Sequence, residues 1–195
     1  FIFASSGAPV GEANPPIHEE IPAKPVSPYG ASKLAGEGYC SAYFRTFGVH
    51  TVVLRFGNVY GPGSVHKSSV VANFIKRALD GKELEVYGDG SQTRDFIYLD
   101  DLIEAIIRSA DADRVGGEIF QIATNRETTV EELVIELSNI LSDAGLPNVT
   151  IVNRDRRLGD VQRNYSDTSK ARSRIGWQSR FSLAEGLNET VKYFI

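Results

Sequence analysis

The chain has 195 residues, of which 42% are hydrophobic and 24% charged, and its formal net charge at pH 7 is −4. This composition is typical of globular proteins, and the length fits one medium domain or a large part of a two-domain unit. The negative charge argues against a general polyanion binder, so no nucleic-acid partner is expected. No run of about 18 apolar residues is present, so no membrane span is expected. A lone cysteine, Cys40, excludes an internal disulfide and favours a reducing, cytoplasmic compartment.

The predicted elements alternate between strands and helices. In chain order they are a strand over 1–5, a helix over 29–47, a strand over 51–56, a helix over 68–79, strands over 84–87 and 95–98, a helix over 100–110, a strand over 118–123, a helix over 129–144, a strand over 149–152, and helices over 168–175 and 183–194. Strand, helix, strand is the order found in a doubly wound α/β sheet, which is therefore the predicted fold class.

Two of these helices have clear end signals. Ser27 is a suitable N-cap for the helix over 29–47, Pro28 suits a first helical position, and Gly48 suits the C-terminal stop. Thr129 followed three residues later by Glu132 forms a capping box at the start of another helix. The strand over 1–5 is apolar, as expected for a buried parallel strand.

A tyrosine, Tyr29, precedes a lysine, Lys33, by four residues in the segment Ser27-Pro28-Tyr29-Gly30-Ala31-Ser32-Lys33. Positions four apart share one face of a helix, so the two side chains can meet. An ammonium beside a phenol favours the phenolate and lowers the pKa of the tyrosine from about 10. The hydroxyl of Ser6, at the end of the first strand, can relay that proton to a substrate alcohol. The three residues predict an acid–base device that suits oxidation and reduction of an alcohol.

Other segments occur in a fixed order with this device. They are Phe1-Ile2-Phe3-Ala4-Ser5-Ser6, Arg55-Phe56-Gly57-Asn58-Val59-Tyr60-Gly61-Pro62 and Tyr87-Gly88-Asp89-Gly90-Ser91-Gln92-Thr93-Arg94-Asp95-Phe96. Together they resemble the extended short-chain dehydrogenase/reductase family, specifically its NAD-dependent nucleotide-sugar epimerase/dehydratase branch. The resemblance covers essentially the whole chain.

The resemblance implies a C-terminal part of a Rossmann-type parallel sheet, together with a smaller α/β substrate-binding domain. Residues 1–57 and 95–123 are expected to belong to the NAD-binding domain, and residues 58–94 and 124–195 to the nucleotide-sugar domain. No Gly-x-Gly-x-x-Gly follows a strand in this sequence. We therefore expect that roughly the first third of the enzyme, with the glycine-rich loop that holds the cofactor pyrophosphate, is missing here.

The resemblance also assigns roles around the cofactor. Tyr29 and Lys33 are expected to act in catalysis and to contact NAD, since the family's lysine also binds the nicotinamide ribose. Ser6 matches the catalytic hydroxyl, and the adjacent Ser5 is taken as a cofactor contact. Because successive residues of a strand point to opposite faces, only one of the two serines can face the cleft.

The residues that the resemblance assigns to the nucleotide sugar are Asn58, Val86, Tyr87, Arg94, Arg157, Asp160 and Asn164. Arg94 and Arg157 are candidates for the diphosphate, because a guanidinium binds phosphate oxygens in pairs. Val86 and Tyr87 match the segment around the base ring, with a plain core strand as the alternative. Asp160 matches a contact to a ribose hydroxyl or a nearby arginine, and Asn164 a position that limits bulk at the sugar C2. A solvated turn is the alternative for the charged run over 154–157.

The leading functional expectation is NAD-dependent epimerisation at C4 of a UDP-hexose through a 4-keto sugar. Gly7 and Ala8 follow Ser6, where related dehydratases carry an aspartate and a glutamate, which weakens a dehydratase or decarboxylase reading. A dehydratase, decarboxylase or reductase remains an alternative, and so does a nucleotide-sugar-binding module without activity for this chain alone. The three histidines show no ligand spacing, so no metal is expected. A homodimer through the helix over 29–47 is expected for the intact enzyme.

Overall fold

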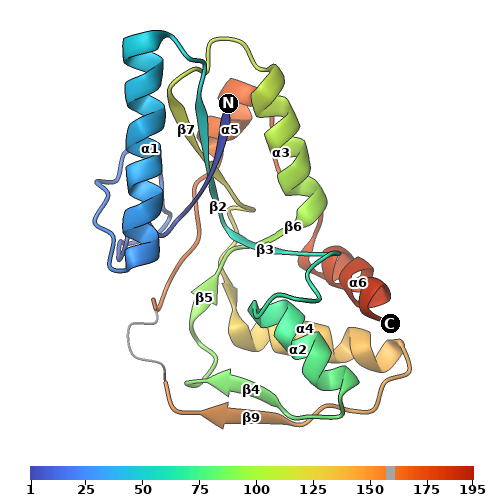
Figure 1. Cartoon of the computed structure of the whole chain (residues 1–195). Coiled ribbons are helices and arrows are strands. Elements are labelled where there is room, and N and C mark those ends of the chain that lie inside the picture. The colour runs from blue at the N-terminus through green and yellow to red at the C-terminus, as the bar shows by residue number, and fades with distance from the viewer. Residues whose placement is uncertain (157–160) are drawn as a thin grey trace.

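The computed structural model describes residues 1–156 and 161–195. One part is a three-stranded sheet flanked by helices, and the other is a group of helices over short strand pairs (Figure 1). The N-terminus lies at the sheet, whereas the C-terminus lies at the other part. None of the described helices is long and apolar enough to cross a membrane.

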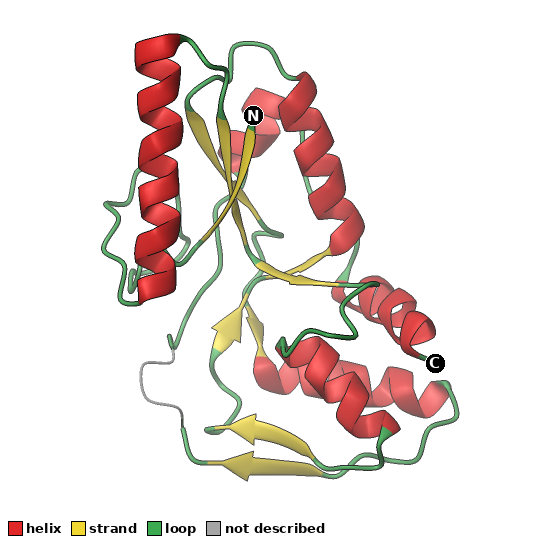
Figure 2. Cartoon of the chain, viewed as in Figure 1, coloured by secondary structure: helices red, strands yellow, loops and turns green. Residues whose placement is uncertain are grey.

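The sheet is parallel throughout. β1 (Ile2–Ser6) pairs with β2 (Val52–Phe56), which pairs with β7 (Glu118–Ile122). Helix α1 (Pro28–Phe47) lies along one side of the sheet, and α3 (Leu99–Asp111) lies along the other (Figure 2). The expected α/β fold with a Rossmann-type parallel sheet is confirmed.

Strand alternation sorts the β2 side chains between the two faces. Val52 and Leu54 are fully buried in a core shared with α3 and with α5 (Ser169–Ile175), which ends next to the buried Trp177. Arg55 points the other way and meets Glu37 of α1. The two faces of β2 therefore differ, since one is apolar and the other carries the buried Arg55 beside Val53.

The second part has its own core. Helices α2 (Val70–Leu79), α4 (Val130–Asp143) and α6 (Leu183–Phe194) pack with β4 (Leu84–Tyr87), which pairs in parallel with β9 (Ile151–Arg154). Two short pairs lie between this layer and the sheet. β3 (Asn58–Tyr60) is parallel to β6 (Phe96–Tyr98), and β5 (Thr93–Arg94) is antiparallel to β8 (Thr128–Thr129).

Most predicted elements are confirmed, including the caps. Ser27 Oγ accepts a hydrogen bond from the Gly30 N–H at 3.0 Å, Gly48 ends α1 in the left-handed conformation with φ 67°, and the capping box at Thr129 is present. Three expectations were wrong in detail. The strand expected over 149–152 lies at Ile151–Arg154. β1 is only partly buried, because its outer edge has no partner strand among the described residues. The strand expected over 95–98 begins one residue later, as β6, because Asp95 lies between β5 and β6 and belongs to neither.

The expected division into two domains remains a prediction. Helix α5 falls within the range assigned to the sugar domain, yet its Ala171 and Ile175 pack in the core of the sheet. A chain that crosses between two cores several times makes such ranges hard to place from sequence, because each crossing leaves only a short connecting segment.

An ion pair joins α5 to β7 and gives a pH-dependent prediction. Lys170 Nζ lies 2.9 Å from a Glu118 oxygen, and this hydrogen bond is the main cause that lowers the pKa of Glu118. A lowered native pKa means that the pair stabilises the fold above the ordinary pKa of a glutamate, about 4.3, and is lost as the pH falls through the lowered value. Lys170→Met should reduce the free energy of unfolding by about 0.5–1 kcal/mol at neutral pH.

Urea denaturation of the wild type and of Lys170→Met across a pH series measures the difference in their free energies of unfolding. This difference should disappear in acid below about pH 4. Lys192→Met is the matched control, since Lys192 pairs with Glu189 at a more exposed site of α6. If Lys170→Met lost the same free energy of unfolding at acidic and at neutral pH, the ion pair could not be the source of the loss.

Candidate active site

A cavity of about 480 Å³ opens where β1 and β2 end. Ser6 and Phe56, the last residues of these strands, form part of its wall. The other lining residues come from the loop after β1, β3 and the residue before it, the start of α2, β5, β6 and the segment over 161–166: Gly7, Ala8, Gly11, Val26, Ser27, Gly57, Asn58, Val59, Tyr60, Ser69, Val70, Val71, Arg94, Phe96, Val161, Asn164 and Ser166. In open α/β sheets ligands bind at the carboxyl ends of the strands, which is where this cavity lies.

The two adjacent serines of β1 face opposite sides. Ser6 lines the cavity. Ser5 is 3% exposed, and its Oγ donates to Glu37 Oε1 at 2.5 Å, under α1. Strand alternation separates the two hydroxyls in this way. Ser6 is thus placed as the sequence predicts for a residue at the cleft, whereas the Ser5 hydroxyl is committed to a buried network.

Tyr29 and Lys33 lie on the first turns of α1, at the open edge of β1. Tyr29 is 55% exposed and does not belong to the cavity wall, although its neighbour Ser27 does. Lys33 Nζ lies 5.7 Å from the centroid of the Tyr29 ring and donates to the Ala4 carbonyl at 2.9 Å. The ammonium is therefore held beside the phenol ring by the strand that carries Ser6.

Gly30 brings the start of α1 against the loop that follows Ser6. A Cβ at this position would lie 2.6 Å from the Ala8 carbonyl oxygen. Gly38, two turns further along the same helix, has open space around it. Gly30→Ala should therefore destabilise the protein by about 1–3 kcal/mol through steric overlap. Gly38→Ala should stabilise it by up to about 1 kcal/mol through helix propensity.

Thermal unfolding of the two variants measures these opposite signs. The pair is a matched control, because both substitutions add one methyl group to α1. Equal melting temperatures for the two variants would show that α1 does not approach Ala8 as closely as the structure indicates.

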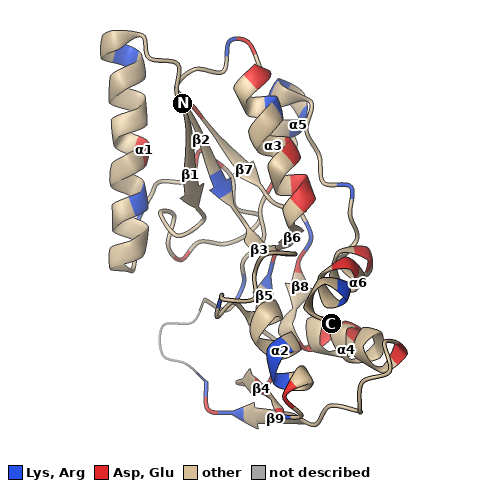
Figure 3. Ribbon diagram, turned by 45° about the vertical axis from the view of Figure 1, so that its right-hand side comes forward, with Lys and Arg blue, Asp and Glu red and all other residues tan. Residues whose placement is uncertain are grey.

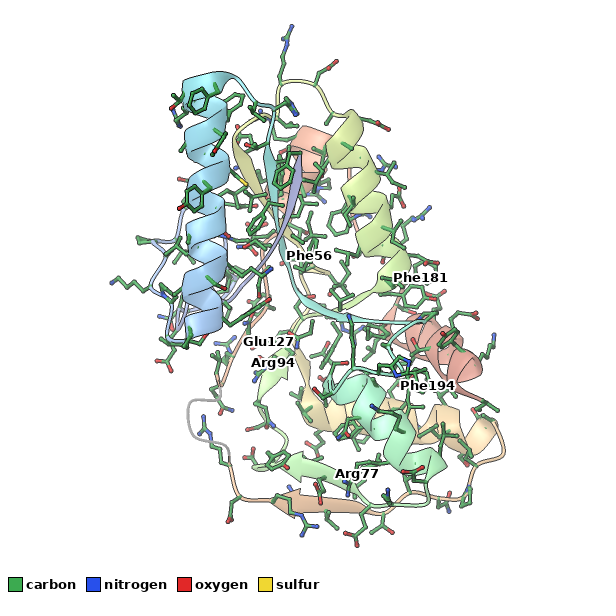
Figure 4. All side chains as sticks on the ribbon, in the orientation of Figure 1. Phe56, Arg77, Arg94, Glu127, Phe181 and Phe194 are labelled. Carbon is green, nitrogen blue, oxygen red and sulfur yellow. The ribbon has the colours of Figure 1, made fainter. Side chains whose placement is uncertain are left out.

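Three of the residues predicted for the nucleotide sugar line the cavity: Asn58, Arg94 and Asn164. Arg94 Nη1 donates to the carbonyl oxygens of Thr93 and Val161, each at 2.7 Å. Figure 4 shows Arg94 and Glu127 together at the β5–β8 pair. Arg94 therefore also supports the cavity wall, because it binds the segment over 161–166.

The other predicted residues are distributed differently. Tyr87 lines a second cavity of about 460 Å³ with Arg156 and Gln162. Val86 is 4% exposed and packs in the core around α4, the plain core-strand alternative considered for it. Arg157 and Asp160 lie outside the described residues, so their predicted contacts stay predictions.

A buried carboxylate, that of Asp95, accepts hydrogen bonds from several segments between the two parts of the structure. Its Oδ1 accepts hydrogen bonds from Thr124 N at 2.7 Å and Oγ1 at 2.6 Å, and its Oδ2 from Asn125 N at 3.0 Å and Ser166 N at 3.2 Å. Burial raises the pKa of Asp95, while these hydrogen bonds oppose that rise. Its own carbonyl accepts from the Asn58 N–H at 2.7 Å. Asp95 thereby ties two cavity-lining segments, at Asn58 and at Ser166, to the segment over 124–125.

Sequence reasoning missed some of these residues. Asp95 lies in the quoted motif next to Arg94, but nothing in the sequence marks it as buried. Ser69 lines the cavity at the N-cap of α2, and its buried Oγ has no hydrogen-bond partner in the described part of the chain. A serine before an apolar run is a helix-start signal, so the sequence could have indicated Ser69 as the N-cap of this helix. Within the described residues, no group of acidic, histidine and cysteine side chains is arranged to hold a metal ion.

The chain resembles known enzymes along its whole length. It is 36% identical to the UDP-glucose 4-epimerase of Mycolicibacterium smegmatis, an alignment that covers 99% of this chain and 61% of that protein. The UDP-glucose 4-epimerase of Thermotoga maritima, solved with UDP-glucose, is 37% identical with a TM-score of 0.90, covering 100% of this chain and 62% of that one. The UDP-glucuronic acid 4-epimerase of Bacillus cereus, solved with UDP-glucuronic acid and NAD, is 30% identical with a TM-score of 0.89, covering 99% and 60%.

A parallel sheet with a cavity at the carboxyl ends of its strands defines a Rossmann-type α/β protein of the nucleotide-binding class. The sequence model of the NAD dependent epimerase/dehydratase family matches residues 1–123. The chain belongs to this family, and NAD is the family's cofactor. The chain spans about 60% of the length of the relatives named above.

Proposed function

We propose that the protein carrying this chain catalyses NAD-dependent epimerisation at C4 of a UDP-hexose, as UDP-glucose 4-epimerases do. The observation that carries the proposal is the placement of Ser6 in the cavity wall while the same strand holds the Lys33 ammonium beside Tyr29. The similarity to UDP-sugar 4-epimerases along the whole chain supports the same conclusion.

The residues of the chain supply proton transfer and position. Tyr29, with the Lys33 ammonium beside its ring, takes the proton from the sugar O4, directly or through Ser6. NAD, when bound, would supply the hydride acceptor and donor for C4, and the chain would have to leave the 4-keto sugar free to turn between the two transfers. Tyr29 then returns the proton to O4. The chemistry needs a pocket that holds the nucleotide and leaves the sugar free to rotate.

The donors on α1 fit the ribose of this cofactor. An ammonium has three donor hydrogens, and Lys33 uses one of them on the Ala4 carbonyl. The others can bind ribose hydroxyls while the charge still acts on the Tyr29 phenol. Because Tyr29 is exposed at the open edge of β1, it is accessible to a cofactor bound there.

The anchoring role falls to residues of the second part. Arg94, Asn58 and Asn164 line the first cavity and suit the diphosphate and sugar, and Tyr87 lines the second cavity and suits the base. We retain Arg157 and Asp160 in this proposal from the family motif. Gly7 and Ala8, which line the cavity after Ser6, bring no acid or base for loss of water, so epimerisation is favoured over dehydration.

We also propose a homodimer and a cytoplasmic location for the enzyme. Tyr39, Tyr43 and Phe47 are spaced four apart on α1 and are 68%, 51% and 70% exposed, which suits a helix interface with a second copy. The lone, free Cys40 suits a reducing compartment. Sedimentation of the intact protein tests the first statement, since a monomer would contradict it.

The function is tested by incubating the full protein and NAD with UDP-glucose and following products by NMR and mass spectrometry. Formation of UDP-galactose at unchanged mass is expected. Loss of water or of carbon dioxide from a nucleotide sugar would instead show the dehydratase or decarboxylase alternative. Binding of UDP-sugar without any turnover would leave only a binding module.

A further inference from the structure

A buried ion pair joins α1 to the middle strand of the sheet. Arg55 Nε donates to Glu37 Oε1 at 2.9 Å and Arg55 Nη2 donates to Glu37 Oε2 at 2.7 Å, with the two side chains 4% and 3% exposed. Moving two charges out of water is costly, and a buried pair of this kind is often no more stabilising than apolar residues of the same size. Its role is therefore better sought in the geometry that it fixes.

One hydrogen-bond donor of the pair is left unsatisfied. Arg55 Nη1 is buried and has no hydrogen-bond partner within the described part of the chain. An unsatisfied buried donor carries a further cost. A network selected for stability alone would not leave this atom unpaired. This is a second reason to look for a role of the pair other than stabilisation.

On the helix side, Glu37 continues the stripe that holds the proposed acid–base residues. Tyr29, Lys33 and Glu37 follow one another at intervals of four, so they share one face of α1. α1 carries few charged residues, namely Lys33, Glu37 and Arg45 (Figure 3). Glu37 is the one that is buried, so its bond to Arg55 fixes the rotation of this face against the sheet.

On the strand side, the Glu37 carboxylate determines which side chains of β1 point toward α1 and which point toward the cavity. Glu37 Oε1 accepts the Ser5 hydroxyl as well as Arg55 Nε, and Ser5 is the register partner of Arg55. With Ser5 held inward, alternation places Ser6 at the cavity. One side chain thus holds both the helix that carries Tyr29 and the strand that carries Ser6.

We propose that Glu37 is a positioning residue for the acid–base step, acting through Arg55 and Ser5 to set the separation of the Tyr29 and Ser6 hydroxyls. The inference rests on the proposed function for its kinetic consequence, but its structural consequence stands independently. Small displacements of reacting groups cost rate far more than binding, so the effect should appear in kcat.

The test compares three variants of the full protein with NAD: Glu37→Gln, the double variant Glu37→Met with Arg55→Met, and the control Glu118→Gln. Glu118 is also ion-paired and lies on the sheet, but at the end of β7 away from the cavity. For each protein, kcat and KM for UDP-glucose, the melting temperature, and hydrogen exchange of residues 28–36 are measured.

Glu37→Gln should lower kcat by roughly 10- to 100-fold with little change in KM, and should speed hydrogen exchange over residues 28–36. The double variant should regain most of the melting temperature that Glu37→Gln loses but not the kcat, because the Ser5 hydroxyl has then lost its acceptor Glu37. Glu118→Gln should leave kcat and exchange unchanged.

Two outcomes would overturn the proposal: exchange over 28–36 that is the same in Glu37→Gln and the wild type, or a double variant whose kcat recovers together with its stability. A wild-type protein that does not interconvert UDP-hexoses would instead refute the proposed function. The exchange measurement would still decide the role of Glu37 in that case.

Discussion

Tyr29→Phe is expected to lower kcat for UDP-hexose interconversion by about 10²- to 10⁴-fold, the range that a positioned general acid–base group contributes. The substitution removes one hydroxyl and keeps the ring that lies beside the Lys33 ammonium. KM for the UDP-sugar should change little, because Tyr29 is not among the residues that line the cavity, whereas the anchoring residues Asn58 and Arg94 are. Steady-state rates with UDP-glucose and UDP-galactose measure both parameters.

Tyr39→Phe provides the matched control. Tyr39 is also an exposed tyrosine of α1, but it lies more than two turns from Tyr29, on the part of the helix away from the cavity. It should retain wild-type kcat. If Tyr29→Phe turns over as fast as Tyr39→Phe, then the proton is handled by another group, and Ser6 would be the first candidate to examine. The kcat of Ser6→Ala should lie between those of Tyr29→Phe and Tyr39→Phe, since Ser6 is proposed to relay a proton that Tyr29 takes.

The elements that were predicted well are those whose ends are set by local chemistry. Ser27 and Pro28 start α1 and Gly48 ends it, and the capping box at Thr129 starts α4, each by contacts within a few residues. Such contacts are determined by neighbouring residues, so a sequence shows them directly. The sorting of Ser5 and Ser6 to opposite faces was predictable for the same reason, because alternation is a local property of a strand.

The features that were not predicted depend on segments far apart in the chain. β3 and β8 are short, and each exists because it pairs with a strand tens of residues away. Glu37 and Arg55 are separated by 18 residues, and nothing around either of them signals burial. The family motif placed Arg94, Asn58 and Asn164 at one cavity, which periodicity and spacing alone could not have done. Local patterns therefore gave the elements, and the resemblance was needed to assemble the site.

Replacing Asp95 should cost the fold a large part of its stability. Its two carboxylate oxygens accept two hydrogen bonds each, from Thr124, Asn125 and Ser166, and the side chain is almost fully buried. In Asp95→Asn, one oxygen becomes an NH₂ group. In the Oδ2 position the new NH₂ group faces the Asn125 and Ser166 N–H groups, and in the Oδ1 position it faces the Thr124 N–H group, so at least one buried donor loses its acceptor in either orientation. We expect a loss of about 3 kcal/mol in the free energy of unfolding, the cost of leaving buried donors unpaired.

Urea denaturation of the Asp95→Asn protein measures this loss, with Asp113→Asn as the matched control. Asp113 lies in an exposed connection, so the same change there should stay within about 0.5 kcal/mol. Because Ser166 and Asn58 line the cavity and both bond to Asp95, the variant should also raise KM for the UDP-sugar at temperatures where it remains folded. A protein as stable as the control would mean that the four donors find other acceptors, and the cavity floor would then not depend on this carboxylate.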